Sequence, residues 1–180
     1  MKYLVFFASI LILLFFGFSY KEVKPENNQL NKQSSAENLI KSSTNFKAHL
    51  SGSEEVPPVK TKAHGEAAFK LSKDGKSIHY KITVANLEDV NMAHIHQGAA
   101  GADGPIVVWL YPGPGTPSAK LIPGKTNGVL AEGTITEANL TGPLADSSMS
   151  SLLKDIKSGN AYVNVHTKQN PAGEIRGQIK

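Results

Sequence analysis

The sequence predicts an all-β domain, built as an antiparallel sandwich or barrel of short strands with one short helix. From Asn45 onward, short apolar runs recur between clusters of Gly, Pro, Asn and Asp, a spacing typical of such folds. Some of these runs alternate apolar and polar residues, as half-buried strands do. Cysteine is absent. Any metal must therefore be held by His, Asp or Glu side chains.

The 180 residues divide into three parts. Residues 1–20 combine Lys2 with a long apolar run and read as a secretory signal peptide, although the match to a cleavage site is imperfect. Residues 3–20 are also just long enough to remain as a membrane anchor. Residues 21–44 are polar and predict a flexible tether, and residues 45–180 form the domain. We therefore expect a secreted, periplasmic or cell-surface protein that touches a membrane only through its N-terminal segment.

The first strand is expected at Phe46–Leu50, and a hairpin follows it. Its arms are Glu66–Leu71 and Ile78–Val84, which flank Lys73-Asp74-Gly75-Lys76. Asp-Gly supplies the residues that a tight turn needs. Alternate residues of a strand share a face, so His79 lies opposite the apolar set of the second arm and should face solvent.

Later strands are expected where apolar runs recur, with antiparallel pairing between neighbours. They are Met92–His96, Ile106–Tyr111, Val129–Thr136, Ala161–His166 and Glu174–Ile179. Tyr111–Gly124 is rich in Pro and Gly and predicts an exposed loop.

One segment, Asp146–Lys157, has a helical pattern. Asp146 can cap the N-terminus, Leu152 and Ile156 recur at helical spacing, and Gly159 can end the helix. We expect this helix to cross between the two sheets.

Three histidines stand out by their positions. His94 and His96 are two residues apart on a strand and therefore project from the same face, while Ile95 points to the core. His166 lies opposite the apolar set of its own strand. If the two strands are neighbours, the three imidazoles converge on the outer face of the sandwich, an arrangement suited to copper or zinc. An H-x-H pair alone is weakly specific, so a polar exterior remains an alternative.

The charged residues give weaker signals. Arg176, on the expected last strand, could return to the histidines and attract an anion, or pair with an acid such as Asp103 or Glu174. Glu54 and Glu55 lie in a loop before two prolines and read as solvated charges without a role. The net charge of +4 comes from scattered lysines, which argues against a nucleic-acid partner. No nucleophile motif supports hydrolysis.

In order, several segments resemble the CHRD (chordin) domain family, and the resemblance spans nearly all of residues 46 to 180. The segments are Leu50–Pro58, Ala93–His96, Gly104–Val108, Val163–Thr167 and Asn170–Ile179. The family is distantly similar to copper/zinc superoxide dismutase, which implies an immunoglobulin-like, Greek-key β-sandwich.

The resemblance also implies a site. In the dismutases an H-x-H pair and a later histidine bind copper, and an arginine near the last strand guides the anion. His94, His96, His166 and Arg176 match that order. Gly104-Pro105-Ile106 stands where the bridging histidine would be, and the zinc-loop ligands are missing. The resemblance therefore implies a copper site in preference to zinc, and no fast dismutation.

Two functions remain open. The first is an extracytoplasmic domain that binds a metal ion, copper favoured, through the three histidines, without expected enzymatic activity. The alternative is a non-catalytic surface module for a protein, glycan or matrix partner, in which the histidines are structural. Trp109, Tyr111 and the loop after them could present such a surface, but Trp109 could equally belong to the core, because it shares a strand face with Val107 and Tyr111.

Overall fold

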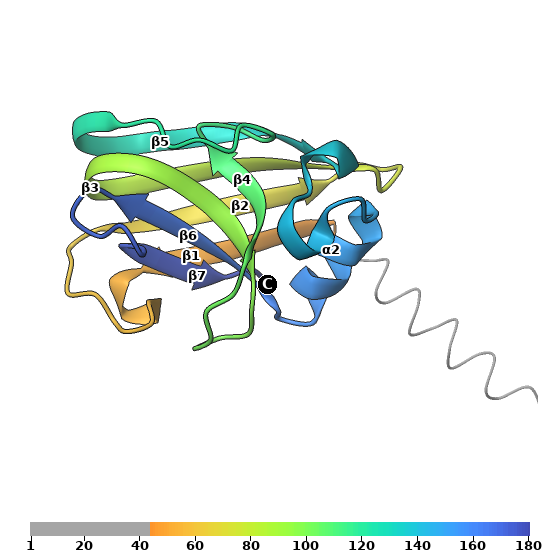
Figure 1. Cartoon of the computed structure of the whole chain (residues 1–180), viewed down its shortest axis with the longest axis horizontal. Coiled ribbons are helices and arrows are strands. Elements are labelled where there is room, and N and C mark those ends of the chain that lie inside the picture. The colour runs from red at the N-terminus through yellow and green to blue at the C-terminus, as the bar shows by residue number, and fades with distance from the viewer. Residues whose placement is uncertain (1–43) are drawn as a thin grey trace, which may run out of the picture.

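The computed structural model of the chain describes residues 44–180. The expected signal or anchor in residues 1–20 lies outside the described residues, as does nearly all of the expected tether. Within residues 44–180 no helix has the length and apolar character needed to cross a membrane. Figure 1 shows the strands of this described part and its one α-helix, which are β1 (Asn45–Ser51), β2 (His64–Leu71), β3 (Ser77–Gln97), β4 (Ile106–Tyr111), β5 (Ile122–Thr136), α2 (Met149–Lys157), β6 (Ala161–Thr167) and β7 (Ile175–Gln178).

The strands close into a barrel-like sandwich. Their order is β2-β1-β7-β6-β3-β4, with β5 also pairing with β3 and a further pairing between β2 and β3 that closes the ring. Every pairing between named strands is antiparallel. The prediction of an all-β antiparallel sandwich with one short helix is confirmed.

Strand β3 is 21 residues long and pairs with four other strands of the seven-stranded sheet. Its first half pairs with β2 and β5, and its second half pairs with β4 and β6. The prediction of two separate strands here was wrong, because the Asn and Asp residues between them form a bend within one strand. Asn86 and Asp89 adopt positive φ angles of 60° and 52°, and the pairing with β5 shifts register next to them. Such irregularities bend a strand without ending it.

The helix α2 lies between β5 and β6 in the chain and at one end of the sandwich (Figure 1). Leu152 and Ile156 are buried, and Gly159 follows the helix with a φ of 73°. Asp146 is not the N-cap, which is Ser148, because Asp146 adopts a left-handed φ of 59° before the helix begins.

Strand β5 begins earlier than the sequence indicated, at Ile122 and not at Val129. Gly124, expected to lie in a loop, donates its backbone N–H to Asp89 Oδ1 at 2.7 Å and stays within the sheet. The irregular stretch after β4 is therefore shorter than predicted.

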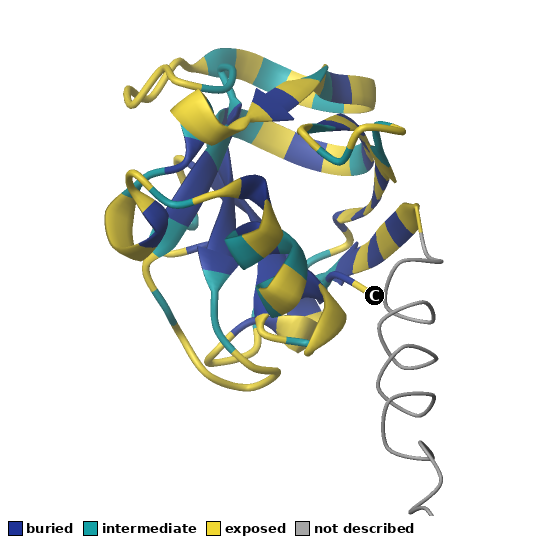
Figure 2. Cartoon of the chain, turned by 90° about the vertical axis from the view of Figure 1, so that its right-hand side faces the viewer, coloured by how far each residue is buried: buried dark blue, intermediate teal, exposed yellow. Residues whose placement is uncertain are grey.

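Burial alternates along most strands, as Figure 2 shows. His79 is exposed, as predicted, whereas its neighbour Tyr80 is buried and donates its hydroxyl to the Leu110 carbonyl at 2.6 Å. Strand β6 departs from this pattern, because every residue from Ala161 to Thr167 is buried. Both faces of β6 are covered, one by the core and the other by loops.

Candidate metal centre

The three histidines lie on adjacent strands. His94 and His96 are in the second half of β3, and His166 is on β6, which pairs directly with that half. In the register, His94 lies opposite Asn164, and His166 lies opposite Met92. The adjacency on which the sequence argument depended is therefore present.

The imidazoles converge on one point. One nitrogen from each of the three rings can be chosen so that all lie within 4.8 Å of one another. The closest pair is His94 Nδ1 and His166 Nε2, at 3.1 Å. Metal–nitrogen bonds of about 2.0–2.1 Å bring ligand nitrogens to about 3.3–4 Å from each other. If the two most widely separated ring nitrogens moved about 1 Å closer to each other, the three nitrogens could hold an ion.

Backbone carbonyls orient two of the rings. His96 Nδ1 donates to the Gly104 carbonyl at 2.9 Å, and His166 Nδ1 donates to the Pro171 carbonyl at 3.0 Å. A proton on Nδ1 leaves the lone pair of each ring on Nε2. Hydrogen bonds of this kind fix the tautomer and the direction of metal-binding histidines.

Two buried ring nitrogens of the cluster have no hydrogen-bond partner within residues 44–180. They are Nε2 of His94 and Nε2 of His96. A buried polar atom without a partner is costly and calls for an explanation. For His96 the atom carries the ring lone pair, which a cation in the cluster would engage. The donor set therefore fits a metal held by three nitrogens.

Burial keeps the cluster uncharged. Burial, with smaller contributions from the nearby His166 and His96 rings, lowers the pKa of His94 to about 3. Burial also lowers the pKa of His166 to about 4 and shifts that of His96 in the same direction. At neutral pH all three rings are neutral, which is the form that binds metals.

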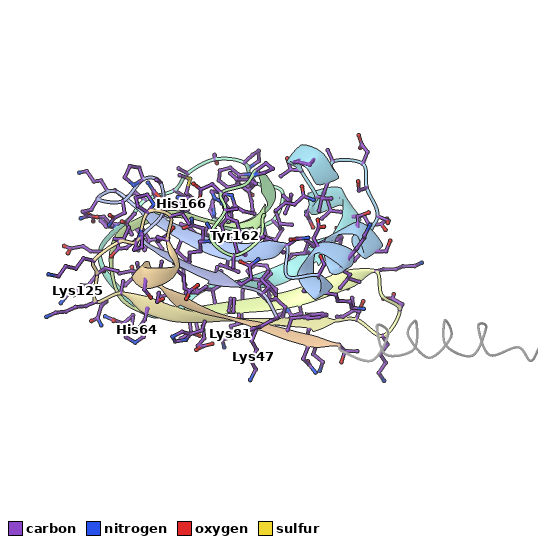
Figure 3. The ribbon with its side chains drawn as sticks, turned by 90° about the horizontal axis from the view of Figure 1, so that it is seen from below. Lys47, His64, Lys81, Lys125, Tyr162 and His166 are labelled. Atoms are coloured by element: carbon purple, nitrogen blue, oxygen red, sulfur yellow. The ribbon has the colours of Figure 1, made fainter. Side chains whose placement is uncertain are left out.

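The prediction of an outer-face site was right about the side of the sheet but wrong about its openness. The exposed fractions of His94, His96 and His166 are 0%, 8% and 5%. Loops cover this face and bring the carbonyls of Gly104 and Pro171 onto the rings. Figure 3 shows His166 on the other side of the ribbon from Lys47, whose side chain extends outward.

Trp109 also packs on the cluster. Its ring centroid lies 4.2 Å from that of His94, with the two planes nearly perpendicular at 84°. It is half-buried on β4, opposite His94 in the register. From the sequence, Trp109 could lie either in the core or on a partner surface. In the structure its ring packs against one side of the histidine cluster.

Arg176, on β7, is bound to the loop that follows β3. Only 2% of it is exposed. Its guanidinium contacts Asp103 Oδ1 at 3.2 Å and donates to the carbonyls of Ala99 and Ala102 at 3.2 and 2.7 Å. Of the alternatives for Arg176, these contacts favour pairing with an acid. Its role as an anion guide stays a prediction.

Stacked aromatic rings connect the Arg176 guanidinium to the histidine cluster. Arg176 Cζ lies 3.4 Å from the ring centroid of Tyr162. The Tyr162 ring stacks on His96, with centroids 5.0 Å apart and an interplanar angle of 7°. The Tyr162 hydroxyl accepts the backbone N–H of Gly104 at 3.1 Å. Arg176 and Tyr162 thus position the loop whose carbonyl orients His96.

Glu55 was missed by the sequence analysis. The sequence predicts that Glu54 and Glu55 are both solvated charges. Glu54 is exposed, but only 6% of the Glu55 surface is exposed. Its Oε2 accepts a hydrogen bond from Asn164 Nδ2 at 3.3 Å. Burial raises the pKa of Glu55 to about 7, although Arg176 opposes the shift. No periodicity marks Glu55, because it reaches β6 only through the path of a loop.

Comparison with known proteins places most of the chain in a family. The CHRD domain model matches residues 46–179. Chordin of Xenopus laevis is 31% identical over 134 residues, which cover 72% of this chain and 12% of chordin. The chain thus spans only a small part of that relative's length. No solved structure matches. Since the family match covers nearly the whole β-sandwich, this chain belongs to the CHRD domain family.

Proposed function

We propose that this chain is an extracytoplasmic CHRD-domain protein that binds one divalent metal ion through His94, His96 and His166. The observation that carries the proposal is the convergence of three buried, neutral imidazoles, two of them oriented by backbone carbonyls. Orientation before binding lowers the conformational cost of ligation. The signal-like residues 1–20 and the relationship to chordin support a secreted, periplasmic or cell-surface location.

Copper is the favoured metal. Imidazole suits both copper and zinc, but the affinity of such sites for divalent first-row ions peaks at copper. Water or an outside ligand would complete the coordination. The protein would then store or deliver copper, or the bound ion would carry out modest one-electron chemistry. The chain's own residues would hold the ion, orient the ligands and exclude solvent.

Electron paramagnetic resonance tests the proposal directly. Copper(II) added to the purified, chelator-treated chain should give a spectrum with several nitrogen ligands. The His94→Ala/His166→Ala double variant should lose that spectrum, whereas His79→Ala should keep it, because His79 is an exposed histidine on the same strand. An unchanged spectrum in the double variant would end the proposal.

A second candidate is a non-catalytic surface module for a protein, glycan or matrix partner. Leu121 and Val129 favour it, because about half of each large apolar side chain is exposed, at 51% and 52%. For such a module the histidines are structural. Identical melting temperatures after chelator and after copper would favour this function over metal binding.

A further inference from the structure

Glu55 and Asn164 form a buried pair with too many acceptors. One hydrogen bond joins them, from Asn164 Nδ2 to Glu55 Oε2. The other oxygens, Glu55 Oε1 and Asn164 Oδ1, are buried and have no partner among the described residues. Both are acceptors when the carboxyl is ionised. An ionised Glu55 would therefore leave two buried acceptors without a donor.

Gly173 shows that these two oxygens face the same point. A Cβ atom added to Gly173 would collide with Asn164 Oδ1 and lie 2.7 Å from Glu55 Oε1. The backbone of Gly173 lies on this side of the pair, and its own N–H is already donated to the Asn170 carbonyl at 3.1 Å. A proton on Glu55 would supply the missing donor to this pair.

The charges around Glu55 do not remove the need for that proton. Arg176 lowers the pKa of Glu55, while Asp103 and Glu174 raise it, and burial is the largest influence. Arg176 is held by Asp103 and two carbonyls. Glu174 already accepts the hydroxyls of Thr61 and Thr167 at 2.7 Å each. Within residues 44–180, Glu55 therefore forms no ion pair of its own.

The pair lies beside the histidines and also reaches solvent. Asn164 is opposite His94 in the register and on the same face of β6 as His166. Glu55 lines a pocket of about 240 Å³ between the loop that carries it and the loop after β6, through Val56–Val59 and Gln169–Gly173. A proton leaving Glu55 would pass into this pocket.

We infer that Glu55 compensates the charge of a cation bound by the three histidines, so that metal uptake releases a proton from its carboxyl. This rests on the proposed metal function. The three neutral imidazoles bring no negative charge, and a divalent ion among them favours an ionised carboxyl nearby. In the metal-free protein below about pH 7, Glu55 is mainly the carboxylic acid; with metal bound it is the carboxylate, and the proton goes to solvent.

Calorimetric titration of the chelator-treated chain with copper(II), in buffers of different ionisation enthalpy, counts the protons released. At pH 6.5 a group with a pKa of about 7 is about three-quarters protonated. Wild type should therefore release about 0.7 proton more than Glu55→Gln at pH 6.5, and the difference should vanish at pH 9. Glu54→Gln, a substitution at the exposed neighbour, should behave as wild type.

Infrared difference spectroscopy gives a second readout. The metal-free wild type at pH 6 should show the carbonyl stretch of a protonated carboxylic acid, which copper removes and which Glu55→Gln lacks. Failure to bind copper would refute the metal function itself. Copper binding with equal proton release in wild type and Glu55→Gln would refute the role of Glu55 and leave the metal site standing.

Discussion

Acid should destabilise the metal-free protein through its buried histidines, and Glu55 should weaken that effect. The pKa values of His94 and His166 fall from 6.5 in the unfolded chain to about 3 and about 4 in the folded one. Below pH 6.5 the two histidines therefore bind up to two protons in the unfolded chain that they do not bind in the native state. The free energy of unfolding consequently decreases as the pH falls. The lowered pKa of His96 acts in the same direction.

Glu55 has the opposite sign. Its pKa rises from 4.5 to about 7 on folding, so between these values the native state holds a proton that the unfolded chain has released. One proton changes stability by about 1.4 kcal/mol per pH unit. From pH 6 to pH 5 the free energy of unfolding should fall by at least about 1 kcal/mol in wild type and at least about 2.4 kcal/mol in Glu55→Gln.

Urea unfolding of both proteins at pH 6 and pH 5, with chelator present, measures these changes. Trp109 is the single tryptophan and lies against His94, so its fluorescence reports on the cluster. Far-UV circular dichroism should give the same midpoints, and the dependence on urea should not change with pH. Equal pH dependence in the two proteins, or a steeper one in wild type, would refute the assigned protonation states.

Three further outcomes are expected. Copper at 100 times its dissociation constant should stabilise wild type by about 2.7 kcal/mol in thermal unfolding, and should leave His94→Ala unaffected. Arg176→Gln should destabilise the fold by about 3 kcal/mol and weaken copper binding although no ligand is removed, since the loop that orients His96 loses its anchor; unchanged copper affinity would contradict that coupling. Gly173→Ala should cost more than about 2 kcal/mol in urea unfolding because its Cβ meets the Glu55 pair, whereas Gly113→Ala, where nothing lies within 4 Å, should cost under about 1 kcal/mol.

The face of each strand on which a side chain lies could be predicted reliably from the sequence. Because side chains alternate between faces, the positions of Ile95 and Val163 were enough to place His94, His96 and His166 on the shared polar side. This argument needs no knowledge of the loops, and the observed pairing of β3 with β6 agrees with it.

Features that depend on tertiary contacts were not accessible in this way. The bend at Asn86 and Asp89 reads as a loop in the sequence, since the same residue types favour both. The burial of the histidines and of Glu55 depends on how surface loops fold over the sheet, and no local pattern encodes that path. The sequence left two alternatives for Arg176, and the contact with Asp103, 73 residues away in the chain, favours pairing with an acid.

The ligands are far apart along the chain, and this separation determines at which stage of folding the metal site can form. His94 and His166 are 72 residues apart, and the strand that carries His166 is among the last to be synthesised. Joining them in an unfolded chain carries a loop-closure cost of about 4 kcal/mol. If the chain crosses a membrane unfolded, as its proposed location implies, only two of the three ligands, His94 and His96, are close together at that stage. The full three-histidine set would arise where the sandwich closes, so the compartment of folding would determine which metal the protein acquires.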